Sequence, residues 1–472
     1  MTASTEEVLG RLSRPLSVRI NSTAGLIADT EKAAAAIDRE RRKNKRNEDR
    51  HYYRKPALRP LSDLSNKDRV VTPWQLLGTF ARATTLARQG RGRGLAEHWQ
   101  SLKYCQALTH NARNFLVLTD EGQSPEQSYR AMQARELGRA FGLVVAERAI
   151  RNYFPDRLIS TVDAETVLLA GFARSGSRPT LGARPRPDFF IEAWKPGEPS
   201  VVFAVTVNGN HQVATKRTSR TARTAFRQLA RGSERADHFH LGQWNTTPCL
   251  LLSTELMAQE GITINALQAP GLGTLPLRPT DGRGSADASV SERNIPYVNA
   301  VQLPPTNGEK RRSHDAFFVP PKNLAWFGQV LARTGAASHL AFAGAGREIA
   351  QYLTLKQGRK HYEQRTFAGA SSVHDASHKI GSTIFVGTDQ VFRLGGKRVE
   401  AFSGIASELY ELLVRGQVEE YRRQAYKLRD TWPRKTTAPE WGPASFSDDG
   451  TVLTLRVLPG AAASEAQSTS RI

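Results

Sequence analysis

Cysteine is nearly missing from this chain: among its 472 residues only Cys105 and Cys249 carry a thiol. Two cysteines so far apart in the sequence exclude a disulfide framework and a zinc site built from cysteines. Long apolar runs are missing too, since no stretch approaches the ~20 apolar residues that a membrane-crossing helix needs. The first segment, MTASTEEVLGRLSRPLSV, lacks the continuous apolar core of a signal peptide. We therefore expect a cytoplasmic protein with no membrane segment.

Acidic residues are also under-represented. The chain has 45 Asp and Glu against 66 Lys and Arg, which gives a formal net charge of +21 and a pI near 10.2. A surplus of this size attracts polyanions, and nucleic acid is the commonest polyanion that a protein meets. An acidic protein partner and a general arginine bias of the source proteome are the alternative explanations. We expect DNA or RNA as the partner, with a protein partner or a second copy of the chain as alternatives.

Changes in composition divide the chain into five parts. The segment RERRKNKR near the N-terminus is either a solvated helix or a nucleic-acid-binding arm. A stretch rich in Pro, Gly and Ser reads as a linker between two folded parts. The predicted parts are a basic, partly disordered N-terminal extension with some helix (1–70), a helical lead-in with the main core (71–267), the linker (268–312), a second, smaller α+β domain (313–459) and a disordered tail (460–472).

Hydrophobic patterning in residues 124–267 predicts a helix, a three-stranded meander, a second helix and further strands. The first helix, SPEQSYRAMQARELGRAFGLVVAERAIRNYFP (124–155), has Ser124 as its cap and Pro125 at its start. A second helical stretch covers about 214–236. The order predicts an α/β (α+β) fold with a core sheet flanked by helices. Short β-branched and aromatic runs predict its strands: TVLLAGF (166–172), RPDFFIEAW (186–194), SVVFAVTV (200–207), TPCLLLSTELM (247–257) and ITINAL (262–267).

Pro187-Asp188 stands on the second predicted strand, and AVTVNGNHQ completes the third. With this order of elements, residues 124–267 resemble the PD-(D/E)XK superfamily, whose fold is restriction-endonuclease-like. Its pattern has Pro-Asp on the second strand and Glu-x-Lys on the third. In such a site two carboxylates hold a divalent cation, the metal activates a water, and the lysine stabilises the developing charge. The resemblance implies a restriction-endonuclease-like core with Asp188 as a metal ligand.

The Glu-x-Lys pair is replaced here by Thr206-x-Asn208. Strand side chains alternate, so Thr206 and Asn208 still share one face. A hydroxyl and an amide, however, supply neither a charged metal ligand nor an ammonium group. Asp188 is nearly alone in front of a dication, so we expect either no cofactor or a weakly bound Mg²⁺ or Mn²⁺.

Groups from elsewhere in the fold could restore such a site. Glu136 or Glu147 on the preceding helix could act as a second metal ligand. Lys216 could replace the lysine, and His211 could act as a base. Each of these has an ordinary surface or capping role as its alternative. The candidate site, remnant or migrated, therefore consists of Asp188, Thr206, Asn208, Lys216 and His211, with Asp188 and Glu136 as its metal ligands.

The second helix has a basic stripe. At about 100° per residue its basic side chains fall within about ±60° of one line. Ala, Phe and Leu side chains occupy the opposite side and would pack on the sheet. Like charges at i,i+4 spacing repel, and arginine's planar fork suits phosphate. We expect this stripe to contact a nucleic-acid backbone through Lys216, Arg217, Arg220, Arg223, Arg227, Arg231 and Arg235.

Three functions follow from these observations. The first is a nucleic-acid-binding protein on a degenerate restriction-endonuclease-like core, acting in phage defence, mobile-element biology or DNA maintenance. The second is a Mg²⁺-dependent endonuclease with migrated catalytic residues, which leaves the question of enzymatic activity open. The third is a non-catalytic assembly subunit that binds an acidic protein. In the second domain, SSVHDASHKIGS (371–382) brings His374, Asp375 and His378 together, and we expect a loop that contacts a partner or phosphate rather than a metal site.

Overall fold

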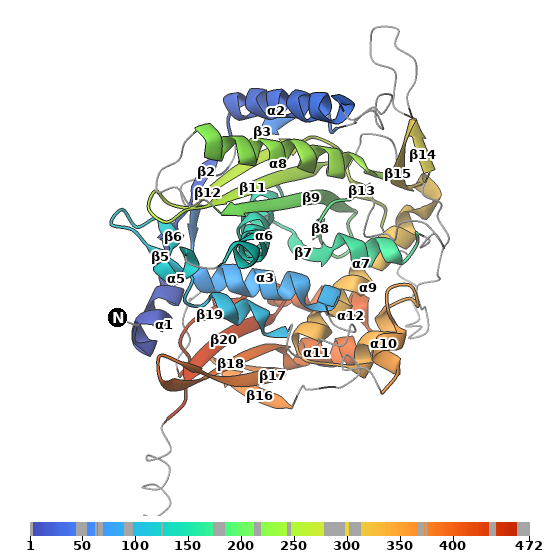
Figure 1. Cartoon of the computed structure of the whole chain (residues 1–472). Helices are drawn as coiled ribbons and strands as arrows, with labels where there is room; N and C mark the ends of the chain where they lie inside the picture. The colour runs from blue at the N-terminus through green and yellow to red at the C-terminus, as the bar shows by residue number, and fades with distance from the viewer. Residues whose placement is uncertain are drawn as a thin grey trace, which may run out of the picture.

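A computed structural model of the protein shows a mixed α and β architecture in several layers (Figure 1). This agrees with the α+β class that the patterning predicts. Among the described helices, none combines the length and the apolar character needed to cross a bilayer. The residues that the structure describes are 3–43, 54–61, 64, 69–88, 98–123, 126–172, 185–211, 219–242, 247–277, 298–301, 313–365, 372, 375–433 and 440–459.

The central sheet has eight strands in the described part of the chain, in the order β2-β12-β11-β9-β8-β7, with β3 beside β12 and β13 beside β9. β7, β8 and β9 form an antiparallel meander. β11 runs parallel to β9 because the helix α8 carries the chain back across the sheet between them. The bounds are β2 Arg19–Asn21, β3 Arg59–Pro60, β7 Leu158–Asp163, β8 Phe189–Trp194, β9 Ser200–His211, α8 Ser219–Asp237, β11 Cys249–Leu256, β12 Thr263–Ala269 and β13 Thr274–Leu275.

Helices cover both faces of this sheet. α6 (Gln127–Tyr153) packs on the face that carries Phe189 and Val205, and α8 packs on the face that carries Phe190 and Ala204. Every residue of β8 and β11 is buried for this reason. α6 lies close to β9, since a Cβ on Gly138 would lie 2.6 Å from the Cα of Gly209.

One strand prediction is wrong. Residues 166–172 are not the first strand of the meander, because Ala164–Leu169 form the helix α7. The side chain of Asp163 accepts a hydrogen bond from the Thr166 amide and caps this helix, and that cap outweighs the β propensity of the sequence. The first strand is the preceding β7. The other predicted strands and both helices are confirmed, but α6 begins at Gln127, with Glu126 rather than Ser124 at the cap position. Residues 214–218 of the second helix lie outside the described residues.

A second sheet of five strands, in the order β16-β17-β18-β20-β19, belongs to the C-terminal part. α3 (Pro73–Arg88) lies between the two sheets and packs on α6, α9 and β19 (Figure 1). The indole of Trp74 donates a hydrogen bond of 2.8 Å to the Leu453 carbonyl. The bounds are α9 Leu324–Phe342, β16 Ala376–Ile380, β17 Thr383–Leu394, β18 Lys397–Ala406, α11 Ser407–Val414, α12 Val418–Leu428, β19 Ala444–Phe446 and β20 Thr451–Val457.

Both sides of the predicted linker contribute to one apolar cluster, which contains Leu137 and Val205 as well as Ala401 and Leu455. The predicted division into domains remains a prediction. A small three-stranded sheet, β10-β15-β14, also joins the two sides. Other elements are α1 Thr5–Ser13, β1 Leu16–Ser17, α2 Ala24–Lys43, β4 Val70–Val71, β5 Leu108–His110, β6 Leu116–Leu118, α5 Asp120–Gln123, β10 Phe239–Leu241, β14 Val298–Val301, β15 Ser313–Val319 and α10 Lys360–Glu363.

Candidate functional site

Asp188 lies immediately before β8, and its carboxylate points at β9. The backbone amide of Asp188 donates to the Val205 carbonyl at 2.9 Å, which fixes the residue beside the neighbouring strand. The amide of Val207 donates to Asp188 Oδ2, also at 2.9 Å. The side chain of Asp188 is only 11% exposed, so water competes little with the groups that hydrogen-bond to its carboxylate.

A guanidinium group occupies the front of this carboxylate. Arg235, from the last turn of α8, donates from Nη1 to Oδ1 at 2.9 Å and from Nη2 to Oδ2 at 2.8 Å. Arg139, from α6, lies 3.8 Å from Oδ1. Both oxygens of Asp188 are therefore engaged by cationic or amide donors. A divalent metal ion would have to displace Arg235, so the residues present here do not fit a Mg²⁺ or Mn²⁺ site.

Thr206 and Asn208 both face α8, as the alternation of the strand predicts. Thr206 is fully buried, and its hydroxyl makes no hydrogen bond within the described residues. Gly232 of α8 lies directly over it: a Cβ at position 232 would lie 2.6 Å from Thr206 Oγ1. Asn208 accepts a hydrogen bond from Arg235 at 3.4 Å. Thr206 is thus sealed beneath the helix, while Asn208 supports the guanidinium that holds Asp188.

The structure does not bring Glu136 or His211 to Asp188. Glu136 accepts from the Tyr104 hydroxyl at 2.5 Å and pairs with Lys103 at 2.6 Å. Neither Glu136 nor His211 lines the cavity beside Asp188. The His211 Nε2 atom lies 3.0 Å from a backbone carbonyl oxygen of α5. Lys216 lies outside the described residues.

A cavity of about 440 Å³ opens beside Asp188, between α2, α6, α8 and the segment that precedes β8. We call it the arginine pocket, because arginines outnumber acids around it. Two of its acids, Glu165 and Glu234, are paired with Arg186 and Arg41. Burial raises the pKa of a third acid, Asp163, and so favours its neutral form. The charged lining consists of Arg41, Arg135, Arg139, Arg186, Arg231, Arg235, Asp163, Glu165, Asp188 and Glu234.

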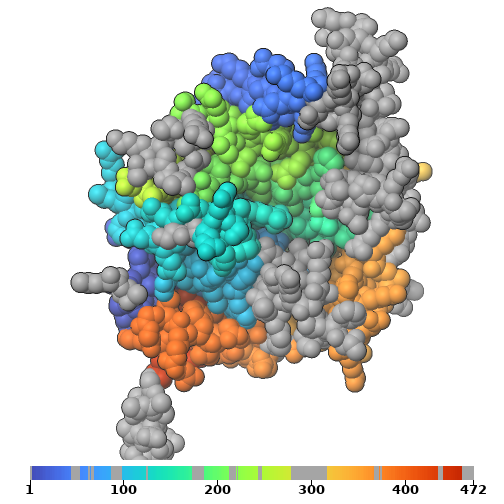
Figure 2. All heavy atoms as spheres, viewed as in Figure 1, coloured from blue at the N-terminus to red at the C-terminus, as the bar shows by residue number. Residues whose placement is uncertain are grey.

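The basic stripe of α8 is less open than the sequence indicates. α2 lies along α8, and in the space-filling view its blue atoms rest on the green atoms of this region (Figures 1 and 2). Glu40 of α2 accepts two hydrogen bonds from Arg227, at 2.9 and 2.6 Å. The hydrogen bond from Arg227 lowers the pKa of Glu40. The chain's own acids thus neutralise Arg227 and Arg235, which corrects the expectation of a fully open stripe.

Part of the stripe remains available. Arg223 and Arg231 are exposed and form no ion pair within the described residues. Lys216 and Arg217 lie outside the described residues, as does the side chain of Arg220. Sequence reasoning missed Arg135 and Arg139, although their i,i+4 spacing on α6 is a signal for two side chains on one face of a helix.

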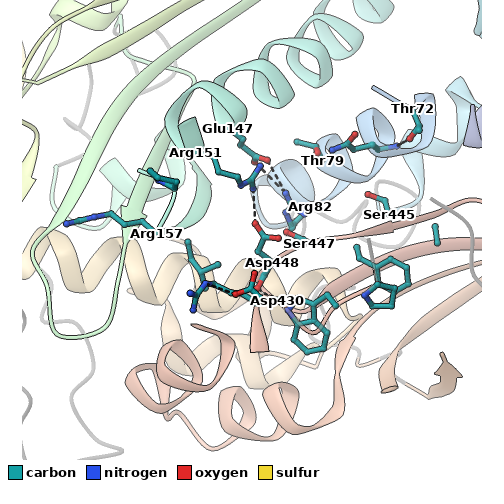
Figure 3. A pocket seen from close by; sticks show the side chains of 18 residues that line it. Thr72, Thr79, Arg82, Glu147, Arg151, Arg157, Asp430, Ser445, Ser447 and Asp448 are labelled. Atoms are coloured by element: carbon teal, nitrogen blue, oxygen red, sulfur yellow. Dashed lines mark hydrogen bonds and ion pairs between the residues drawn. The ribbon is translucent and has the colours of Figure 1, made fainter. Parts of the chain in front are cut away.

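A second cavity, of about 460 Å³, opens between α3, α6 and the second sheet (Figure 3). Arg82 lies there 3.4 Å from Glu147 and 3.7 Å from Asp449. Burial lowers the pKa of Arg82, but the carboxylates of Asp449 and Glu147 outweigh burial and leave the pKa raised. The other arginines of the lining also have acidic partners, as Arg151 has in Asp448. Ion pairs along the lining of this cavity therefore link the two sheets, and its arginines form no group of unpaired cations.

The segment 371–382 differs from the expected loop. Ala376–Ile380 form β16 at the edge of the second sheet, and His378 lies on this strand. His374 lies outside the described residues, so its position relative to His378 is not described.

No family model matches the chain, and neither a curated protein nor a solved structure is detectably similar to it.

Proposed function

We propose that this protein binds DNA or RNA through the arginine pocket and the adjoining exposed part of α8, on a restriction-endonuclease-like core that does not cut. The observation that carries the proposal is the paired contact of Arg235 with Asp188. The carboxylate that the resemblance assigns to a metal holds a guanidinium group instead. A phosphate can approach the pocket through Arg231, which is exposed and has no ion pair within the described residues, because a guanidinium group is a fork of donors suited to phosphate oxygens.

The order of elements supports the core that we propose. A helix, an antiparallel meander, a crossover helix and a strand parallel to the third follow one another in α6, β7, β8, β9, α8 and β11. This is the order implied by the resemblance, with Asp188 beside the second strand of the meander. The extra helix α7 and the strands β2, β3 and β12 extend this unit.

Loss of cutting has a physical basis in the same residues. Metal-assisted hydrolysis needs a cation that polarises the phosphate and acidifies a water. Here the two Asp188 oxygens are occupied, and Thr206 is buried beneath α8. Phosphate contacts of this kind position a nucleic acid without reading its sequence.

Binding is tested by fluorescence anisotropy with labelled duplex DNA, single-stranded DNA and RNA across a range of salt. On duplex DNA the logarithm of affinity should fall with the logarithm of salt by about 0.9 per phosphate contact. Arg223→Ala with Arg231→Ala should weaken binding and reduce the slope by about 2. The matched control is Arg393→Ala with Arg398→Ala, two exposed arginines that face each other on β17 and β18. Equal losses in both double variants would contradict a specific role for α8.

Cleavage is tested separately on plasmid DNA with Mg²⁺ and with Mn²⁺. We expect the plasmid to stay intact. Cleavage that disappears in Asp188→Ala would establish the endonuclease with migrated residues in place of the binding protein. If the wild type binds no nucleic acid and instead copurifies with an acidic protein, the assembly role replaces the proposal.

A further inference from the structure

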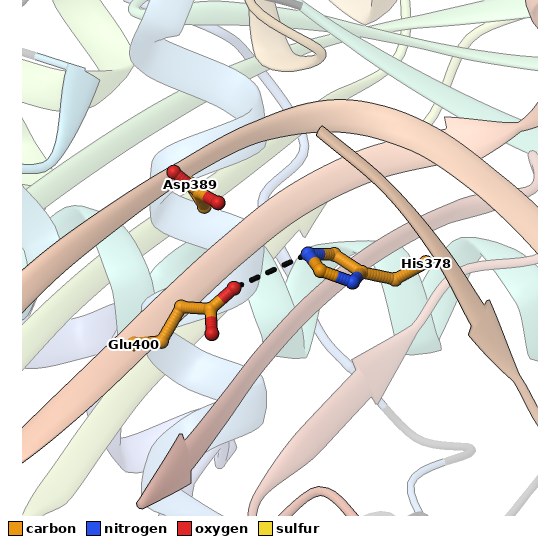
Figure 4. A group of neighbouring side chains, drawn as sticks. All are labelled: His378, Asp389 and Glu400. Atoms are coloured by element: carbon orange, nitrogen blue, oxygen red, sulfur yellow. Dashed lines mark ion pairs between the residues drawn. The ribbon is translucent and has the colours of Figure 1, made fainter. Parts of the chain in front are cut away.

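Three side chains that can bind a metal converge on one face of the second sheet: His378 on β16, Asp389 on β17 and Glu400 on β18 (Figure 4). The register pairs His378 with Phe385 and Asp389 with Phe402. Because strand side chains alternate, these pairings put all three residues on the same face. One possible ligand atom of each lies within 4.8 Å of the others.

The neighbouring residues hold two of these side chains in place. Glu400 is only 4% exposed, and its Oε2 atom accepts a hydrogen bond from Arg456 at 2.6 Å. Arg456 is itself fixed above the Trp441 ring, 4.5 Å from its centroid. The ring of His378 stands edge-on to Trp441 and to Phe402, with centroids 5.1 and 4.7 Å away. Such surrounding contacts orient ligands at metal sites.

The orientation of the Glu400 and His378 side chains leaves two potential ligand atoms facing each other. Glu400 Oε1 lies 3.2 Å from His378 Nε2, and within the described part of the chain this buried Nε2 atom forms no well-aligned hydrogen bond. Burial lowers the pKa of His378, which favours the neutral ring that binds metals. A dication between the two atoms would satisfy the lone pair of the imidazole and the charge of the carboxylate.

Asp389 completes the group from the solvent side. Its pKa is raised by burial and by two neighbouring carboxylates, Glu400 and Asp375. Asp389 and Glu400 therefore repel each other on one face, with Asp375 close enough to add to the repulsion and with Arg456 in contact with Glu400. Like charges at this spacing disfavour one another, and a bound divalent ion relieves that repulsion.

We propose that His378, Asp389 and Glu400 bind one divalent transition-metal ion of the Zn²⁺ class. An imidazole among the ligands favours Zn²⁺ over Mg²⁺ or Ca²⁺, which prefer oxygen alone. Zn²⁺ holds nitrogen and oxygen ligands at about 2.0–2.2 Å in tetrahedral geometry. The 3.2 Å between His378 Nε2 and Glu400 Oε1 is close to the separation of two ligand atoms on one such ion, and a carboxylate oxygen of Asp389 lies within 4.8 Å of both. Three protein ligands leave the fourth position open to solvent, where a water can bind.

The test is isothermal titration calorimetry of the full-length protein with Zn²⁺ alone, followed by visible spectroscopy with Co²⁺ as a probe of four-coordinate geometry. We expect the wild type to bind one Zn²⁺ at this site, and Asp389→Asn to weaken that binding at least about tenfold. Asp389 is exposed, so this substitution leaves the buried contacts of the sheet intact. Circular dichroism checks that the variant is folded.

Asp375→Asn is the matched control, because it removes the same charge from the same region but takes away no proposed ligand. It should change Zn²⁺ affinity only a few-fold, as expected for a screened neighbouring charge. If the wild type binds no Zn²⁺, or if Asp375→Asn and Asp389→Asn weaken binding equally, the proposed coordination is wrong. This outcome is independent of nucleic-acid binding at the arginine pocket.

Discussion

At the scale of single residues, the structure of the arginine pocket depends on the hydrogen bonds that the carboxylate of Asp188 accepts. Asp188 receives two hydrogen bonds from Arg235 and one from a backbone amide, and it is nearly buried. Removing one partner of such a contact leaves the other group desolvated and unpaired, and this costs more than the contact contributes. The pair therefore stabilises the junction of α8 with the sheet.

Arg235→Ala should lower the free energy of unfolding by about 1–3 kcal/mol, because Asp188 then remains without its bidentate partner. Asp188→Ala added to this variant should cost clearly less than Asp188→Ala in the wild type. Urea unfolding of the four proteins measures this coupling as a double-mutant cycle. Arg415→Ala, which removes an exposed arginine that pairs with Glu411, is the control and should have little effect. Additive losses would show that the two residues act independently.

A buried carboxyl elsewhere on α8 makes stability depend on pH. Burial raises the pKa of Asp237 from 3.8 to about 7, against the opposing effect of Lys55. The folded protein therefore keeps a proton between these values that the unfolded chain has released, so the contribution to stability is lost as pH rises from about 4 to about 7. Asp237→Asn should gain stability relative to the wild type as the pH rises. Urea midpoints of both proteins at pH 5 and pH 8 measure the change, and a difference that does not vary with pH would contradict the raised pKa.

At the scale of elements, α2 determines how much of α8 is open. Ala34 and Ile37 of α2 pack against Ala230, and the ion pairs of Arg227 with Glu40 and of Arg41 with Glu234 flank this contact. An acid from α2 thus lies among the cations that we propose for phosphate. It lowers the local positive potential without closing the arginine pocket.

Glu40→Ala should therefore tighten nucleic-acid binding and steepen its salt dependence, because Arg227 becomes free for a phosphate. Anisotropy titrations against salt measure both effects. Glu31→Ala is the matched control: it removes an equal charge from the same helix, about half a turn of the helical wheel away from Glu40. If both variants bind equally well, the gain comes from net charge alone and not from release of Arg227.

The hydrophobic periodicity of short segments explains how much of the fold and of the candidate site could be predicted from the sequence. The opposite apolar and basic sides of α8 and the apolar runs of β8 and β9 are periodic, so their structures follow from residues close in the chain. The partners of the arginines do not follow in this way. Glu40 and Arg227 are 187 residues apart, and Asp188 and Arg235 are 47 apart. The first pair forms only because α2 packs on α8, and the second only because α8 packs on the sheet. The cap at Asp163 is a local signal, but it competes with a strong β propensity.

At the scale of the whole molecule, α3 connects the two sheets. Trp74 is fully buried, donates to Leu453 of β20 and belongs to the cluster that also contains Leu137 of α6. A core that draws residues from both sides of residues 268–312 should lose its packing on both sides at once.

Trp74→Ala should lower the melting temperature of the whole protein while leaving a single transition. The expected cost is about 3–5 kcal/mol, as for other large aromatic side chains removed from a core. Differential scanning calorimetry of the full chain measures it. Two transitions, of which the substitution moves one, would show instead that the predicted domains unfold separately.

The close contact of Gly232 with Thr206 also limits which amino-acid substitutions could turn this protein into a nuclease. A glutamate at 206 has no room, since the glycine above it would not accommodate even a methyl group. A hydrolytic site at this position would require α8 to shift first, before any new acid could reach solvent. We expect libraries of single amino-acid replacements to yield no nuclease from this scaffold, however many clones are screened.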